Sequence, residues 1–305
     1  MACSVKWNKP FFSLKGDAVS ESLEQKKKLI ERLKEKNSVY AEILSFYQKV
    51  LEEQDAEKPA VHVQYSGATN KTRDLQTKEG FPLINRNDFY LDVPAAVRVF
   101  ESLCQVLRNT NEKMRENIQA IEEAVSINAL NLRELVKRHS DDVYVNSIAD
   151  QFDINRAVLV FLIHSSIQPS LNMNVEQLKH EVDSQNWLRG YCPVCGSAPR
   201  ISELKGEGAR SFLCSFCGFQ WPSERLKCPY CDNTDHKTLQ YIYEEGQEAY
   251  RVDVCENCKQ YIKTVDSRKL NYTPDLQLED IITIHLDILA FDHGYKTPVP
   301  SPFGL

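Results

Sequence analysis

Residues 191–219 read YCPVCGSAPRISELKGEGARSFLCSFCGF, and residues 227–232 and 254–259 read KCPYCD and VCENCK. These stretches hold four C-x-x-C pairs in succession: Cys192/Cys195, Cys214/Cys217, Cys228/Cys231 and Cys255/Cys258. Two residues between cysteines let both thiolates of a tight turn face one tetrahedral ion, and two such turns complete its four-coordination. We therefore predict that the eight cysteines form two Cys₄ metal sites. The alternative, eight reduced core thiols, is disfavoured by the regular spacing.

The spacing between the pairs suits zinc-ribbon units. Eighteen residues separate Cys195 from Cys214, which is within the usual range, and 23 separate Cys231 from Cys255, slightly beyond it. Sequential use of the pairs is the simplest arrangement. A cross-braced arrangement, in which the first pair joins the third and the second joins the fourth, remains open.

The residue after each pair also differs between the two units. Gly196 and Gly218 follow the pairs of the first unit, where a left-handed residue lets backbone N–H groups point at sulfur. Asp232 and Lys259 hold those places in the second unit, so we expect the second site to be looser.

Zinc and a rubredoxin-type iron both suit a tetrahedral S₄ site. Because all four ligands of each ion are protein thiolates, no position remains for water or substrate. A closed site of this kind argues against hydrolytic metal catalysis.

Strand-like segments lie between the cysteine pairs, at residues 211–213, 239–243 and 250–254, with a turn expected at Glu245–Gly246. They predict two small β units, at residues 187–226 and 227–270. Each unit needs its ion because its apolar core is very small.

Apolar residues recur at helical spacing in much of the remaining chain. The predicted fold is therefore a multi-domain α+β protein, with a helical domain over residues 1–186, the two β units, and a C-terminal helix with an extended tail over residues 271–305. The expected helices are 20–53 with a break at Asn37–Ser38, 94–109, 111–137, 141–148, 155–167 ending before Pro169, and 278–291. Residues 55–92 are expected to be mostly loop.

Composition restricts the class of protein. The net charge of −6 does not favour a polyanion partner. The N-terminus lacks the apolar core of a secretory signal and the apolar runs are too short for a membrane span, so we expect a cytoplasmic protein without membrane insertion. In that reducing compartment, ten cysteines favour metal binding over disulfides.

Several other residues have plain structural interpretations. Cys104 is expected in a helical core and Cys3 in a terminal segment. We interpret His164 as a core histidine, and His236 as superfluous where four thiolates are available. Asp280 and Asp287 are expected on the polar face of the C-terminal helix, either solvated or contacting a partner. We interpret Lys26-Lys27-Lys28 as a solvated helix face.

The cysteine motifs, together with Leu278-Glu279-Asp280-Ile281, His285-Leu286-Asp287-Ile288, His293-Gly294-Tyr295 and Pro302-Phe303, closely resemble the FdhE family of formate dehydrogenase accessory proteins. The resemblance implies a helical domain, two rubredoxin-like domains that bind iron, and no catalysis. It further implies a cytoplasmic partner, the catalytic subunit of a molybdenum- or tungsten-dependent formate dehydrogenase, whose assembly or maturity such chaperone-like proteins assist or check. The sequence leaves self-association open.

Two other functions compete with an assembly factor. The first is electron transfer or redox sensing by iron, with Phe216, Phe219 and Trp221 shielding a centre. The second is nucleic-acid binding by zinc ribbons, with residues 148–156 resembling a helix-turn-helix. However, residues 157–163 are apolar and belong in a core. Two M²⁺(Cys⁻)₄ centres would also bring residues 188–269 from a formal +1 to roughly −3.

Overall fold

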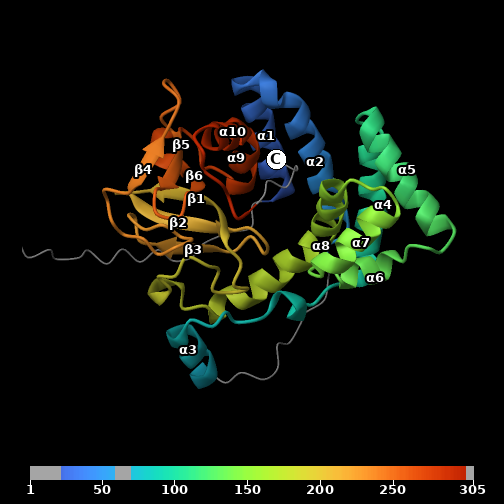
Figure 1. The fold of residues 1–305 in the computed structure, drawn as a ribbon, viewed down its shortest axis with the longest axis horizontal. Helices are drawn as coiled ribbons and strands as arrows, with labels where there is room; N and C mark the ends of the chain where they lie inside the picture. Colours follow the sequence, from blue (N-terminus) through green and yellow to red (C-terminus); the bar gives the residue numbers. More distant parts are fainter. Residues whose placement is uncertain (1–21, 59–69, 300–305) are drawn as a thin grey trace, which may run out of the picture.

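The computed structural model describes residues 22–58 and 70–299, and its helices lie beside a single sheet (Figure 1). Ten α-helices occur in these residues: α1 (Leu23–Lys36), α2 (Ala41–Ala56), α3 (Asn70–Glu79), α4 (Val93–Arg108), α5 (Glu112–Ser126), α6 (Leu132–Lys137), α7 (Asp142–Gln151), α8 (Arg156–Leu178), α9 (Leu276–Ile282) and α10 (Ile284–Asp292). The predicted class is confirmed: a helical N-terminal region precedes a β region with two cysteine groups and C-terminal helices. Cys3 and the expected Pro302-Phe303 motif lie outside the described residues.

The β region is one continuous sheet of six strands in the order β3-β2-β1-β6-β5-β4. The strands are β1 (Pro199–Lys205), β2 (Ala209–Cys214), β3 (Gln220–Ser223), β4 (Leu239–Ile242), β5 (Tyr250–Cys255) and β6 (Gln260–Asp266). Neighbouring strands are antiparallel except β1 and β6, which pair in parallel with Ile201 opposite Lys263. This pair joins the halves that carry the two cysteine groups. The domain limits predicted above stay predictions.

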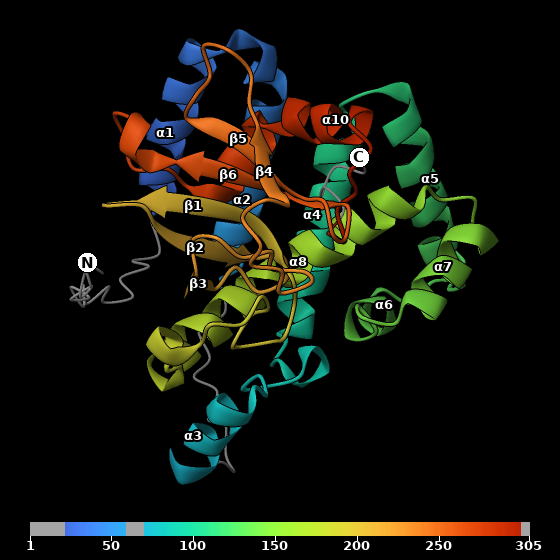
Figure 2. The ribbon, with the colours of Figure 1, turned by 60° about the vertical axis from the view of Figure 1, so that its left-hand side comes forward.

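The two faces of the sheet pack against different helices. On one face, Leu213 and Tyr261 share an apolar cluster with Leu286 and Ala290 of α10. On the other face, the adjacent residues Phe212 and Ile262 share a cluster with α8. Side chains alternate between the faces of a strand, so neighbouring residues enter different cores. The sheet is therefore a middle layer, with α9 and α10 on one face and α8 on the other. Helix α8 extends from the other helices to the sheet (Figures 1 and 2).

The beginning and the end of the described chain pack together. Ile30 and Leu33 of α1 and Leu44 of α2 share an apolar cluster with Leu278 and Ile281 of α9. Helices α1 and α2 accordingly lie beside α9 and α10 in both views (Figures 1 and 2). The break predicted at Asn37–Ser38 is confirmed, because Asn37 ends α1 and its side chain accepts from the Val39 N–H at 3.2 Å.

Helix α8 continues through Pro169, so the predicted end before this residue is wrong. Proline has no N–H to donate to the carbonyl four residues earlier, which normally destabilises a helix interior. Here the Gln54 Nε2 of α2 donates to that carbonyl, Ser165 O, at 2.8 Å. The side chain from a distant helix replaces the missing backbone donor, which accounts for the continuous helix.

Three further helix predictions are corrected by the structure. The helix expected over 111–137 is divided into α5 and α6, because Asn128 is left-handed with φ 58° and Asn131 caps α6. The C-terminal helix is divided at Thr283, whose Oγ1 donates to Glu279 O at 2.6 Å. Residues 70–79 form α3, although a loop was expected there.

Glu279 of α9 is fully buried beside two tyrosines. Its Oε1 accepts from the Tyr272 hydroxyl at 3.0 Å, and that hydroxyl lies 3.0 Å from the Tyr250 hydroxyl. Burial raises the pKa of Glu279 to about 7, and the hydrogen bonds of the two tyrosines oppose this rise only in part. A carboxyl group whose pKa is raised on folding destabilises the fold as pH rises from its unfolded pKa to its folded pKa.

We therefore expect Glu279→Gln to increase the free energy of unfolding at pH 8 by about 2–3 kcal/mol and to change it little at pH 4.5. The amide keeps the shape of the carboxyl group but carries no charge to bury. The measurement is the difference between wild type and variant in urea unfolding at each pH, which cancels the pH dependence of the cysteines. Equal differences at pH 4.5 and pH 8 would contradict the expectation.

Candidate metal centres

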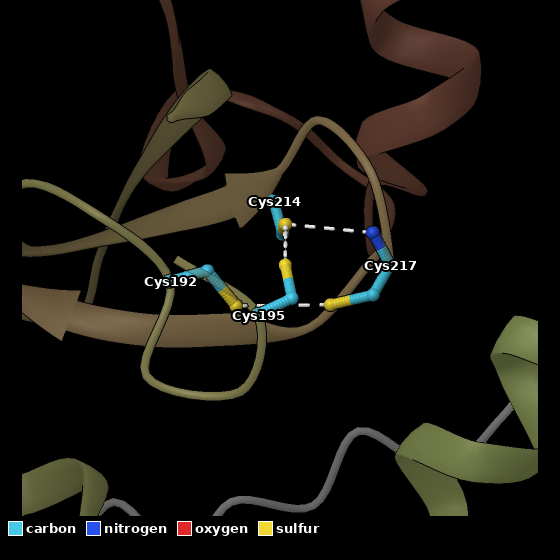
Figure 3. Close-up of side chains that lie close together, drawn as sticks. All are labelled: Cys192, Cys195, Cys214 and Cys217. Carbon is cyan, nitrogen blue, oxygen red and sulfur yellow. Dashed lines mark hydrogen bonds between the residues drawn. The ribbon is translucent and has the colours of Figure 1, made fainter. Parts of the chain in front are cut away.

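Four cysteines form a first group at one end of the sheet (Figure 3): Cys192, Cys195, Cys214 and Cys217. The Sγ atoms of Cys192 and Cys217 are 3.7 Å apart, those of Cys195 and Cys214 are 3.4 Å apart, and all four lie within 4.8 Å of one another. A disulfide bond would require about 2.05 Å. Metal–sulfur bonds of about 2.3 Å in a tetrahedron place the sulfur atoms about 3.8 Å apart, so the group fits one tetrahedral ion.

The other four cysteines form a second group of the same size. Cys228 and Cys258 have their Sγ atoms 3.7 Å apart, and Cys231 and Cys255 have theirs 3.7 Å apart. The structure therefore brings the pairs together in sequential order, not in the cross-braced order. That the two groups hold metal stays a prediction, and their donor set of four thiolates fits zinc or iron.

Each C-x-x-C turn is closed by a left-handed residue: Gly196 at φ 74°, Gly218 at 73°, and Asp232 and Lys259 both at 56°. In three of the turns, the N–H of this residue donates to the carbonyl of the first cysteine. The distances are 2.8 Å from Gly196 to Cys192, 3.1 Å from Asp232 to Cys228 and 2.8 Å from Lys259 to Cys255. The second group thus has the turn geometry of the first, although it lacks the glycines.

Hydrogen bonds to sulfur favour thiolates in both groups. Cys214 Sγ accepts from the backbone N–H groups of Phe216 and Cys217, each at 3.4 Å. In the second group, the side-chain amide of Asn233 donates to Cys255 Sγ at 3.4 Å and that of Asn257 donates to Cys231 Sγ at 3.5 Å. These two asparagines were not predicted from the sequence, although their positions within or beside a C-x-x-C pair were a usable signal.

Burial and hydrogen bonding act on the thiols in opposite directions. Burial opposes ionisation of Cys255, but hydrogen bonds from Asn233 and from backbone N–H groups lower its pKa to about 7. Burial raises the pKa of Cys192 and of Cys217. In the first group, hydrogen bonds from the neighbouring thiols lower the pKa of Cys195 far below its ordinary value.

The first group is enclosed by the helical region. Its four cysteines are buried in one cluster with side chains of α4, α6 and α8, among them Ala96, Val136 and Ile167. The segment after α3 also binds the first turn, because the N–H of Leu83 donates to Pro193 O at 2.9 Å and that of Ile84 donates to Val194 O at 3.0 Å.

Phe216, which precedes Cys217, inserts between aromatic side chains of the helical region. Its ring centroid lies 5.7 Å from that of Phe89, 5.7 Å from that of His139 and 5.6 Å from that of His164. Burial lowers the pKa of His164 to about 4, which leaves a neutral ring beside Phe216. His164 is therefore a packing residue, and the two cysteine groups do not include it.

The second group is partly exposed. Cys228 and Cys255 are buried, whereas Cys231 and Cys258 retain intermediate exposure. Cys228 and Cys255 also line a groove over the sheet, together with Leu226, Tyr230, Tyr241 and Arg251. Two of the four cysteines are therefore in contact with solvent, and His236 is exposed outside the group.

A glycine substitution tests the enclosure of the first group. A Cβ atom added at Gly196 would lie 2.9 Å from Pro82 Cγ, whereas one added at Gly246, also left-handed with φ 85°, meets nothing within 4 Å. In both alanine variants the left-handed backbone lowers the free energy of unfolding by about 1–2 kcal/mol. We expect Gly196→Ala to lower the free energy of unfolding by more than Gly246→Ala, measured in urea. Equal losses would show that Pro82 does not confine the turn.

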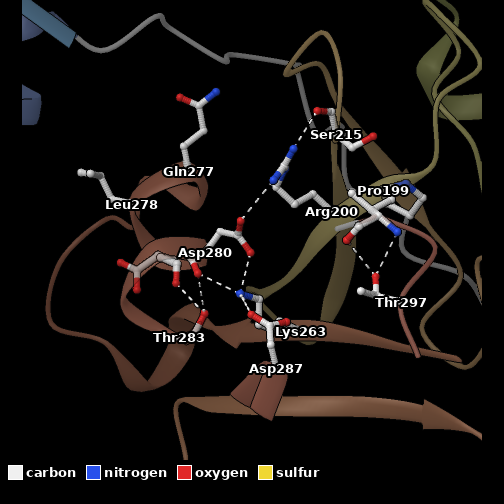
Figure 4. A network of polar contacts seen from close by, with 12 residues as sticks. Pro199, Arg200, Ser215, Lys263, Gln277, Leu278, Asp280, Thr283, Asp287 and Thr297 are labelled. Carbon is white, nitrogen blue, oxygen red and sulfur yellow. Dashed lines mark hydrogen bonds and ion pairs between the residues drawn. The ribbon is translucent and has the colours of Figure 1, made fainter. Parts of the chain in front are cut away.

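Asp280 and Asp287 are buried, so their expected exposure on a solvated or partner-binding face is wrong (Figure 4). Lys263 Nζ lies 2.7 Å from a carboxylate oxygen of each, and the Tyr261 hydroxyl donates to Asp287 at 2.8 Å. The pattern of residues 278–291 did not predict the burial of the two aspartates, because the lysine that compensates their charge lies on another element, β6. Arg200 lies 3.6 Å from Asp280 and donates to Ser215 O at 3.0 Å, so it links the first cysteine group to α9.

Other predicted features fall in the core or form contacts. Cys104 is 4 % exposed, which confirms its core position. Val158, Leu159 and Leu162 of α8 are buried, so the apolar helix beside the helix-turn-helix pattern is a core helix, as expected. Lys26 is not simply solvated, because its Nζ lies 2.8 Å from a carboxylate oxygen of Asp275, the N-cap residue of α9.

Within residues 22–58 and 70–299, none of the helices combines the length and the apolar character that a bilayer crossing requires.

Comparisons with known proteins identify relatives of this chain. The family models of the FdhE central domain and the FdhE C-terminal domain match residues 191–225 and 226–303. A curated protein of Aquifex aeolicus, "Protein FdhE homolog", is 28% identical over 269 residues, which cover 86% of this chain and 88% of that protein. "Protein FdhE" of Escherichia coli K12 is 29% identical over 120 residues, 38% of each chain.

A solved structure shares the fold. The crystal structure of the FdhE protein from Pseudomonas aeruginosa superposes with a TM-score of 0.64 and 21% sequence identity, covering 93% of this chain and 97% of that chain. The helical region and the sheet thus recur together in a second protein.

Proposed function

This chain belongs to the FdhE family, and we propose that it is a metal-binding accessory factor that binds the catalytic subunit of a formate dehydrogenase in the cytoplasm and assists its maturation. The observation that carries the proposal is the pair of Cys₄ groups within the segments that match the FdhE domains. Each ion would have four protein thiolates as ligands and no free position for a substrate. We therefore propose a role in binding, not in catalysis.

The proposed ligands are Cys192, Cys195, Cys214 and Cys217 for the first ion and Cys228, Cys231, Cys255 and Cys258 for the second. When bound, each ion cross-links two tight turns and neutralises part of the thiolate charge. The donor set is compatible with iron and with zinc. The chain's own residues position the sulfur atoms, through the left-handed turn residues and the amides of Asn233 and Asn257.

A redox role is the second candidate, and the partial exposure of Cys231 and Cys258 favours it at the second group. Iron held by four thiolates can change oxidation state, whereas zinc cannot. The absorption spectrum of freshly purified protein distinguishes the two. A colourless protein with two zinc ions would exclude the redox role and leave the assembly role intact.

The assembly role is tested by co-purification. Tagged, reduced and metal-loaded full-length chain is mixed with the catalytic subunit of a formate dehydrogenase, and the eluate is compared with that of the chelator-treated chain. We expect the catalytic subunit to be retained by the loaded chain. If the loaded chain repeatedly retains none of it, the proposal is wrong.

A further inference from the structure

The two cysteine groups differ in how they are attached to the rest of the molecule. The first group is held from outside its own turns by four sets of contacts: the backbone bonds from Leu83 and Ile84, the close approach of Pro82 to Gly196, the aromatic cluster around Phe216, and the bond from Arg200. These contacts come from the segment after α3, from the turn after α6, from α8 and from β1. An opening of the first group must therefore separate the helical region from the sheet.

The second group is held mainly by its own half of the sheet and by the segment after α10. The Lys296 N–H donates to Lys259 O at 2.9 Å, and Tyr295 contacts Glu256. On the side of β1, the Tyr230 hydroxyl donates to Pro199 O at 3.2 Å, and Gly190 lies close to Pro229. These contacts leave Cys231 and Cys258 of the group partly exposed to solvent.

The sheet beneath the second group has support that does not depend on a metal ion. Strand β5, which ends at Cys255, pairs with β6 from Tyr250 to Cys255. Val252 and Val254 of β5 are buried in the cluster that contains Leu286 of α10. The turns of the second group can therefore open while β5 and β6 remain in place.

We propose that the first Cys₄ group is a permanent clamp between the helical region and the sheet, and that the second is an exchangeable site that takes up and releases a thiophilic divalent metal ion in the folded protein. This inference rests on the metal binding proposed above. Exchange is a ligand substitution without electron transfer: a donor atom of an incoming chelator takes the place of the Cys231 or Cys258 thiolate, and the displaced thiolate takes a proton from solvent or re-binds. The amide of Asn257 holds the Cys231 sulfur against this displacement.

The test uses the full chain loaded with zinc, with the stoichiometry confirmed by metal analysis. Zinc release is followed with the chromogenic chelator 4-(2-pyridylazo)resorcinol, and free thiols are trapped with N-ethylmaleimide and located by peptide mass spectrometry. We expect one of the two zinc ions to be released at least about tenfold faster than the other. Opening the second group is local and requires less free energy than opening the first group, which separates the helical region from the sheet. Alkylation should appear first at Cys228, Cys231, Cys255 and Cys258, with the near-ultraviolet circular dichroism unchanged.

Two other outcomes overturn the inference. Release of both equivalents at one rate, or earlier alkylation of Cys192, Cys195, Cys214 and Cys217, would show that the groups are not distinguished in this way. A folded protein that binds fewer than two equivalents would contradict the proposed metal binding itself, and the inference with it. Metal analysis before the release experiment separates this failure from the first.

A matched pair of variants links the two rates to the two groups. Phe216 and Asn257 each precede the second cysteine of a pair, but Phe216 is 8 % exposed among the helices and Asn257 is not buried. We expect Phe216→Leu to accelerate the slow equivalent only and Asn257→Ala to accelerate the fast equivalent only. An unchanged slow rate in Phe216→Leu would refute the clamp. Leucine retains an apolar side chain, so that this variant is more readily folded than alanine would be.

Discussion

Replacing Cys217 by serine is expected to remove the first metal ion and to lower the melting temperature by more than about 10 °C. Cys217 is 1 % exposed and lies in the apolar cluster that joins α8 to the sheet. Loss of the ion would remove the metal–sulfur bonds that cross-link the two turns at this junction, and in such sites metal binding contributes directly to the folding free energy. The melting temperature is measured by circular dichroism, and bound metal by elemental analysis of the same sample.

Cys258→Ser is the matched control for this prediction. Cys258 occupies the same place in its pair but is partly exposed. We expect the control to lose one ion as well, with less than half of the decrease in melting temperature. If Cys258→Ser destabilised the protein as much as Cys217→Ser, the enclosed first group would have no special structural role.

Lys263→Met is expected to lower the free energy of unfolding by about 3–5 kcal/mol. The lysine side chain is 5% exposed and pairs with the carboxylates of Asp280 and Asp287, which are 6% and 9% exposed. Methionine has a similar length but no charge, so that two buried carboxylates would lose their common partner. Burial already raises the pKa of Asp287 above its ordinary value in the presence of the lysine.

The control for the buried network is Lys58→Met. Lys58 pairs with Asp55 at the surface, where its side chain is 68% exposed. An exposed pair of this kind contributes about 0–1 kcal/mol, so the control should unfold at nearly the wild-type concentration of urea. Equal midpoints for Lys263→Met and Lys58→Met would show that the lysine is not needed to compensate the two aspartates.

The cysteine groups could be predicted because residues close together in the sequence determine the geometry of each turn. A C-x-x-C pair places both of its thiols in one turn, whatever the rest of the chain does. Between the pairs, β-branched and aromatic residues predicted strands, and the structure has a strand there, for example β5. Even the left-handed conformation is a property of the turn, which is why Asp232 and Lys259 adopt it without a glycine. The resemblance of the same motifs to the FdhE family is confirmed by the domains that match them.

Features that depend on distant partners were not predictable from local patterns. The continuation of α8 through Pro169 depends on Gln54, which is on another helix. The burial of Asp280 and Asp287 depends on Lys263, and the single sheet depends on a parallel pairing between β1 and β6. Periodicity describes one face of one element, whereas these contacts arise only when two elements meet.

Native mass spectrometry of the reduced full-length protein, combined with alkylation of its thiols, is the most direct test of metal binding by the two cysteine groups. We expect a chain that carries two metal ions, in which Cys192, Cys195, Cys214 and Cys217 are protected until a denaturant is added, and in which Cys228, Cys231, Cys255 and Cys258 are protected until a chelator removes their ion. A folded chain without metal whose eight thiols all react at once would contradict it.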